Sequence, residues 1–197
     1  SSVDTPAFGP ATPGLPALAY IVGSFPAASQ QFVVRGIRGL LDAGVPIQVF
    51  ALGRDRKAAV EPIDASWQSK VHFVPWLPWP SLLMGHIEAL IRSPAMYFGA
   101  LATLLTLPHR PRYLVVRALL IFWRAPWIAR KIRQAGGVSR VHAHFATGQT
   151  EMGWAVALLL GRRFSFTAHA RDIYVTPNAL PEKIRAAEFV ITCTRYN

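Results

Sequence analysis

Three of the six histidines in this 197-residue chain lie within one short stretch, residues 141–174. His142 and His144 alternate with apolar residues, so in a β-strand both imidazoles would project from the same face. His169 follows a second apolar run, and Asp172 comes three residues later. A histidine can donate a hydrogen bond to a substrate oxygen near neutral pH, and a nearby carboxylate can orient its ring. His169 and Asp172 are therefore the candidate catalytic pair.

The His142 and His144 pair also fits a metal site, because two ring nitrogens at a strand end can converge on one ion. Such a site needs further ligands, which His169 and Asp172 would have to supply, and no glutamate or cysteine cluster accompanies them. We therefore predict no metal and no cofactor, and keep a metal-dependent hydrolase as a third possibility for function. The structural alternative is that one histidine of the pair is a hydrogen-bonded sheet residue and the other faces a cleft.

The segments that must position these side chains alternate between strand and helix. Apolar runs bounded by Gly and Pro predict strands, and helical spacing with capping residues predicts helices between them. This alternation predicts an α/β fold with a Rossmann-like, mostly parallel, doubly wound sheet, whose ligands bind at the carboxyl ends of the strands. Strands are expected at 18–22, 47–52, 71–74, from 141, at 164–167 and at 189–193, and helices at 29–43, 149–160 and 181–187.

A long helical insertion is expected at about residues 81–135. Proline should interrupt it at Pro94 and around Pro108 and Pro111, and Pro126 predicts a kink or break. Arginines mixed with aromatic residues over 110–133 are typical of interfacial helices. A helix that packs on the core and carries basic residues on its solvent-exposed face explains the same pattern equally well.

The composition points to an anionic partner. The chain carries a net charge of +11 although 52% of its residues are hydrophobic. The arginines lie beside Trp, Phe and Leu rather than in polar runs, and no nucleic-acid-binding motif is present, so we predict an anionic membrane surface and no nucleic acid. The single cysteine, Cys193, lies in an apolar run and is expected to be a buried strand thiol, which indicates a reducing compartment. Residues 1–17 are rich in proline and predict a disordered leader.

Helix starts supply candidate anion sites. Thr147 and Gly148 precede the helix at Gln149, where free backbone amides favour an anion, and the same holds more weakly at Ser29 and Gln30. The sequence contains no G-x-G-x-x-G after a strand and no P-loop, zincin or G-x-S-x-G motif. Ordinary NAD dehydrogenases, P-loop enzymes, zincins and α/β-hydrolases are therefore poor fits.

Three segments carry a family resemblance. Residues 164–174, FSFTAHARDIY, preceded by VHAHFA at 141–146, resemble the amino-terminal domain of a family 4 glycosyltransferase of the GT-B fold, of the bacterial exopolysaccharide and colanic-acid type. Phe25-Pro-x-x-Ser29 followed by Phe32 is similar to that family's FPxxSETFI segment. The resemblance covers nearly all of the chain from Tyr20 onward.

The resemblance implies transfer of a hexose from a nucleotide sugar, with retention of configuration, to a saccharide or lipid-linked saccharide in polysaccharide biosynthesis. His169 matches the family's active-site histidine, which reaches toward the donor sugar, and Asp172 belongs to the same motif. The loop from Gly23 to Ser29 corresponds to one that closes over the cleft near the donor phosphates and the acceptor. The candidate substrate-binding residues are Gly23, Ser24, Ser29, Gln30, His144, Thr147 and Arg171.

Two departures from the family pattern matter. Gln30 and Gln31 stand where relatives usually have Glu-Thr, and Gly36 stands where they have Glu. Relatives also continue, beyond the point that matches Asn197, into a second domain that holds the nucleotide sugar. We therefore expect residues 18–197 to form the amino-terminal domain, inactive alone, at the cytoplasmic face of the cell membrane. The alternative of a different class is a non-catalytic module that binds a membrane or a partner chain.

Overall fold

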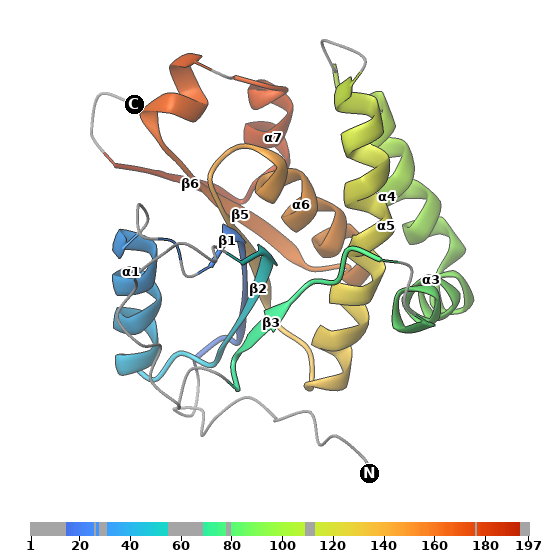
Figure 1. Ribbon diagram of the computed structural model, residues 1–197, viewed down its shortest axis with the longest axis horizontal. Coiled ribbons are helices and arrows are strands. Elements are labelled where there is room, and N and C mark those ends of the chain that lie inside the picture. Colours follow the sequence, from blue (N-terminus) through green and yellow to red (C-terminus); the bar gives the residue numbers. More distant parts are fainter. Residues whose placement is uncertain are drawn as a thin grey trace.

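The protein forms a three-layer α/β structure around one parallel sheet (Figure 1). The strands that the structure describes are β1 (Leu18–Ser24), β2 (Ile47–Gly53), β3 (Val71–Phe73), β4 (Arg140–His144), β5 (Arg163–Ala168) and β6 (Phe189–Thr192). They pair in the order β3-β2-β1-β4-β5-β6, every pair parallel, which confirms the predicted Rossmann-like doubly wound fold. This computed structural model describes residues 15–25, 27, 31–54, 69–77, 80–108, 113–175 and 177–193.

Helices cover the two faces of the sheet unequally (Figure 1). One face is covered by α1 (Gln31–Asp42), whose Val33 and Ile37 pack against apolar residues of β1 and β2. The opposite face is covered by α6 (Gly148–Leu160), with the helices of the insertion beyond it. The remaining helices are α3 (Pro80–Arg92), α4 (Pro94–Thr106), α5 (Tyr113–Gln134), the π-helical turn η2 (Arg171–Val175) and α7 (Leu180–Ala186).

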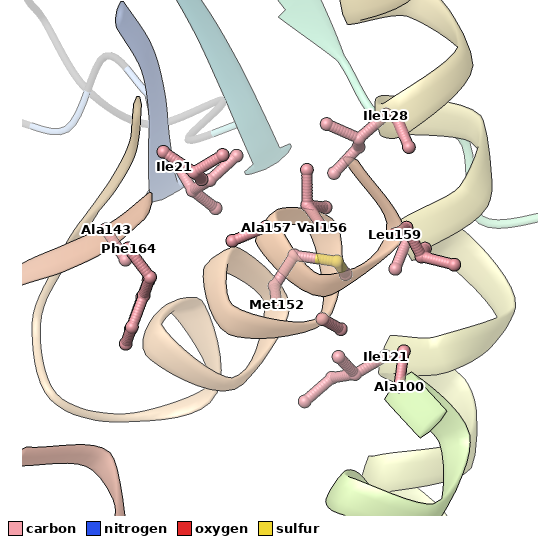
Figure 2. Packing of buried hydrophobic residues seen from close by; sticks show 14 of the residues in the cluster. Ile21, Ala100, Ile121, Ile128, Ala143, Met152, Val156, Ala157, Leu159 and Phe164 are labelled. Atoms are coloured by element: carbon pink, nitrogen blue, oxygen red, sulfur yellow. The ribbon is translucent and has the colours of Figure 1, made fainter. Parts of the chain in front are cut away.

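Helix α6 is the centre of the larger core (Figure 2). Its Met152 and Val156 lie between strand residues such as Ile21 and Ala143 and helix residues such as Ile128 of α5. A helix that is apolar on all sides is stable only where it is enclosed on all sides. The sheet therefore depends on the insertion to cover α6, and the insertion is an integral layer of this domain.

The insertion begins and is interrupted where proline predicted it, with one exception. It separates into α3, α4 and α5 at Pro94 and after Thr106, but α5 runs through Pro126 as a single helix, so a break there is wrong, and the alternative of a kink stays a prediction. His86 joins the three helices: its Nδ1 lies 2.8 Å from the Tyr97 hydroxyl and its Nε2 donates to the Trp123 carbonyl at 2.9 Å. Burial lowers the pKa of His86, so it makes these bonds as a neutral ring. Gly85 of α3 lies against the backbone of Pro126, where an added Cβ would be 2.9 Å from the carbonyl carbon, so α3 packs directly on α5 at its proline.

Apolar character alone does not make these helices membrane-spanning. In the described part of the chain, no single helix is both long and apolar enough to cross a membrane. Helices α3 and α4 meet that criterion only when taken together, and they are bent by 117° where they join.

The remaining predicted elements agree with the structure to within a few residues, and two features were not predicted. The first is the turn η2, which follows β5. The second is that residues 15–17 lead directly into β1, and that Leu15 and Pro16 line a cavity of about 350 Å³ beside α1. Most of the expected leader, residues 1–14, lies outside the described residues.

Two glycines make a matched test of the packing between α3 and α5. A Cβ at Gly85 would lie 2.8 Å from the backbone nitrogen of Trp127, whereas a Cβ at Gly99, in α4, would meet nothing within 4 Å. We predict that Gly85→Ala forces the helices apart and lowers the free energy of unfolding by about 1–3 kcal/mol. Gly99→Ala should raise it by about 0.5–1 kcal/mol, because alanine is the better helix former. Urea unfolding measures both changes, and equal effects of the two substitutions would refute the close crossing.

Candidate functional site at the carboxyl edge of the sheet

The candidate residues converge where the strand order reverses. His144 ends β4 and His169 directly follows β5, beside the end of β1. His142 and His144 project from the same face of the sheet, as predicted, and both rings contact Tyr20 of β1. Open α/β sheets bind ligands at this reversal point, outside the carboxyl ends of the strands.

A chain of hydrogen bonds connects four side chains across the site. The Tyr20 hydroxyl lies 2.9 Å from Nδ1 of His144, and Nε2 of His144 lies 2.9 Å from Nε2 of His169. Nδ1 of His169 lies 2.9 Å from Sγ of Cys193. The chain therefore runs from the buried centre of the sheet at Tyr20 to the exposed sulfur of Cys193.

The buried tyrosine at one end of this series of hydrogen bonds indicates which atom donates in each of them. Burial raises the pKa of Tyr20, so its phenol stays protonated, and we infer that it donates to Nδ1 of His144, the acceptor that it contacts. Because Nδ1 of His144 then accepts, its Nε2 carries the proton and donates to His169. His169 accepts at Nε2 and donates from Nδ1 to the Cys193 sulfur. Each imidazole in this arrangement is neutral.

Burial keeps these histidines neutral. It lowers the pKa of His144 to about 3, and the neighbouring His169 and His142 add to the shift. The pKa of His169 is also lowered by burial, although the charge of Asp172 acts in the opposite direction. His169 is half-buried, whereas His144 is only 6% exposed. The site therefore offers a ligand hydrogen bonds rather than positive charge.

His142 has a structural role. Its Nδ1 lies 2.9 Å from the Ser165 hydroxyl and its Nε2 lies 3.0 Å from the Thr167 hydroxyl, so both nitrogens are satisfied by β5. Burial, with a smaller effect of Arg140, lowers its pKa to about 4. Within the described ranges, no group of three or more His, Cys, Asp or Glu side chains is placed to hold a metal ion.

Asp172 requires a correction, because its carboxylate does not bind the His169 ring as the sequence suggested. Oδ2 of Asp172 accepts from the backbone amides of Ala146, at 2.9 Å, and of His169, at 3.2 Å. The side chain is only 3% exposed. Asp172 therefore positions His169 through its backbone and its charge, and a direct catalytic role does not follow from this geometry.

A buried ion pair fixes the loop after β4. Nζ of Lys183 lies 3.0 Å from Oε1 of Glu151, and both side chains are fully buried. Lys183 also donates to the carbonyl of Ala146 at 3.0 Å, so Lys183 and Asp172 hold opposite sides of the same residue. Arg117 completes the cluster at 2.9 Å from Oε1 of Glu151. Loss of one member of such a pair typically costs about 3–5 kcal/mol.

The same loop contains an unusual backbone conformation. Phe145, between His144 and Ala146, has φ of 74°, a region that residues other than glycine rarely adopt. Its carbonyl accepts from the Thr150 hydroxyl at 2.7 Å, and its ring contacts that of His169 with centroids 4.7 Å apart. The strand alternation predicted from the sequence thus ends at His144, and the turn brings Phe145 onto the histidine side.

The predicted anion site at α6 is partly occupied by the protein itself. The Thr147 hydroxyl donates to the side-chain oxygen of Gln149 instead of capping the helix. The amide of Gln149 lies over Gly23, where an added Cβ would be 2.4 Å from its Nε2. Gly23 therefore permits close approach of Gln149, a residue that the sequence did not identify.

The other candidates differ in how the structure places them. Ser24 ends β1 and Arg171 lies in η2, and both are exposed. Ser29 and Gln30 lie outside the described residues. Cys193 was expected to be buried but is exposed, because β6 is the edge strand of the sheet and ends just before it.

Arg124 illustrates why net charge alone does not locate an anion site. This guanidinium is 4% exposed and donates to the carbonyls of Leu52, Val74 and Pro75, at the ends of β2 and β3. Burial lowers its pKa to about 10, so it remains charged at neutral pH. Its charge stabilises backbone carbonyls and is not available to a ligand.

The neutral histidines predict acid destabilisation. The pKa values of His142 and His144 are about 4 and about 3 in the folded protein, against 6.5 when unperturbed. The unfolded chain therefore binds more protons below pH 6.5, and stability should fall with pH from there down to the folded pKa values. Each histidine contributes a slope of about 1.4 kcal/mol per pH unit within that window.

His142→Asn should reduce this slope by about 1.4 kcal/mol per pH unit in urea unfolding between neutral and mildly acidic pH. Arg171→Gln, at an exposed position, is the control and should leave the slope unchanged. An unchanged slope in His142→Asn would show that His142 is not buried in its neutral form.

No family model matches this sequence, and comparison with curated proteins gave no significant match. Function is therefore inferred from the fold, from the geometry at the carboxyl edge of the sheet and from the family resemblance of the sequence.

Proposed function

We propose that this chain is the acceptor-side domain of a retaining glycosyltransferase that moves a hexose from a nucleotide sugar to a saccharide or lipid-linked acceptor. The observation that carries the proposal is the position of His169. It is a half-buried, neutral histidine at the carboxyl end of β5, beside the reversal point of a Rossmann-like sheet. The FTAHARDIY segment that contains it is the part of the chain most similar to family 4 glycosyltransferases.

His169 would act as a hydrogen-bonding group toward the sugar. A neutral imidazole presents one donor and one acceptor, which suits a hydroxyl group without placing a net charge beside it. In the free protein these positions are taken by His144 and Cys193. A sugar hydroxyl would therefore replace one of these contacts, and Asp172 would keep the backbone of His169 in place.

The chemistry of the transfer requires groups beyond this site. Glycosyl transfer breaks the bond between the sugar and the diphosphate, and the leaving diphosphate needs positive charge or amide donors. The histidines are neutral, and Arg117 and Arg124 are bound to protein groups. We therefore propose that a second domain, as in the family that the sequence resembles, binds the nucleotide and forms the other side of the cleft.

The test is sugar transfer by the product of the complete reading frame. Membrane extracts would supply acceptors, and labelled uridine and guanosine diphosphate hexoses would supply the donor. We predict transfer with retention of configuration, and a fall in turnover of about 100-fold or more in His169→Ala with little change in melting temperature.

His72→Ala is the matched control, since this half-buried histidine lies on β3, away from His169 in the sheet order. Two outcomes would contradict the proposal. One is the absence of transfer from every donor, and the other is full turnover in His169→Ala.

The surface of α3 supports a second candidate function, docking on an anionic membrane. Its exposed apolar side chains recur at helical spacing along one side and are Leu83, Met84, Ile87 and Ile91. Ile91 is 78% exposed, which is unusual for an isoleucine. The net charge of +11 adds attraction to anionic lipid, so we propose peripheral binding at the cytoplasmic membrane face.

Co-sedimentation with liposomes tests this candidate. We predict binding to vesicles that contain phosphatidylglycerol, weakened by salt and by the double substitution Ile87→Glu with Ile91→Glu. Ile184→Glu, at an exposed isoleucine of α7, adds the same kind of charge elsewhere and is the control. Binding that ignores both lipid charge and the α3 substitutions would exclude this surface.

A further inference from the structure

The exposed end of the hydrogen-bond chain is a sulfur atom. Cys193 is the single cysteine of the sequence, and it is exposed directly after β6. Its Sγ lies 2.9 Å from Nδ1 of His169, whose other nitrogen is held by His144. An imidazole N–H directed at a sulfur atom can stabilise the thiolate, which is the nucleophilic form of cysteine.

The direction of the hydrogen bonds determines whether the Cys193 sulfur is a donor or an acceptor. Because Tyr20 donates to His144 and His144 donates to His169, the proton of His169 is on Nδ1 and points to the sulfur. Sulfur is thus the acceptor in the pair. A thiolate is a far stronger acceptor than a thiol, so this N–H stabilises the deprotonated form.

We propose that Cys193 is a reactive thiol, activated by His169, and a site of thiol–disulfide exchange with small disulfides. The thiol gives its proton to water, and the thiolate remains hydrogen-bonded to Nδ1 of His169. The thiolate attacks one sulfur of the disulfide, a new bond forms between the two sulfurs, and the other half leaves as a thiolate. The resulting mixed disulfide lies against the His169 ring, so the modification would close the candidate site.

The rate of reaction with dithiobis(nitrobenzoate) tests the proposal, because each exchange releases one coloured nitrothiobenzoate thiolate. We predict that at pH 7 the folded protein reacts at least about tenfold faster than His169→Phe. The phenylalanine keeps an aromatic ring beside Phe32 and Phe145 but has no N–H to offer. Tyr20→Phe, which removes the first donor of the chain, should fall between the two.

The pH profile separates activation from simple exposure. The advantage of the wild-type protein over His169→Phe should be largest at pH 7 and should shrink toward pH 9, whereas simple exposure would leave the two rates equal at every pH. In denaturant all variants should react at the same rate, and Cys193→Ser should not react. Mass spectrometry of the adduct locates the modification.

Equal rates and equal pH profiles in the wild-type protein and His169→Phe would overturn the proposal. The result is independent of sugar transfer, because the readout is the thiol reaction of this chain alone. A fast, His169-dependent thiol in a protein that transfers no sugar would leave this inference standing and contradict only the proposed function.

Discussion

The buried ion pair between Lys183 and Glu151 is the interaction on which the carboxyl edge of the sheet depends. Both side chains are fully buried, so Lys183 and Glu151 compensate each other's charge, with Arg117 as a second partner of Glu151. Lys183 binds the carbonyl of Ala146, and Asp172 binds its amide, so the loop after β4 is fixed from both sides. The strained backbone of Phe145 persists in that loop because its neighbours are held in this way. Asp172 also holds the His169 amide, which connects the ion pair to the exposed end of the site.

The histidine rings of the site are uncharged, although the whole molecule is strongly basic. The net charge is +11, yet the rings of His142 and His144 are kept neutral by burial. Tyr20, buried at one end of the hydrogen-bond series, determines which ring nitrogens carry protons, and the exposed sulfur of Cys193 accepts a hydrogen bond at the other end. We expect such a site to favour a neutral hydroxyl group over a phosphate, because it offers hydrogen bonds of fixed direction and these two rings carry no charge. This preference is consistent with the proposal that the chain positions a sugar while the nucleotide binds elsewhere.

The sequence predicted the order of strands and helices because each element has a local signal: apolar runs, capping residues and proline. It also placed His142 and His144 on one face, since side-chain alternation is a property of any strand. It did not predict the helix through Pro126, which depends on packing against α3, or the role of Asp172, which binds amides in two separate segments. The contacts of Tyr20 and Cys193 with the histidines were not predicted, because they arise only through strand order, with β1 beside β4 and β6 at the edge beside β5. Contacts between strands distant in sequence have no local pattern.

The central claim is that the imidazoles of His144 and His169 are neutral and share one direction of hydrogen bonding. Long-range nitrogen–proton correlation spectra of protein labelled with ¹⁵N in histidine measure this directly, because they distinguish a protonated ring nitrogen from a bare one. At neutral pH the account predicts a proton on Nε2 of His144 and on Nδ1 of His169, and neither ring doubly protonated. An imidazolium at either residue, or the opposite tautomers, would contradict it.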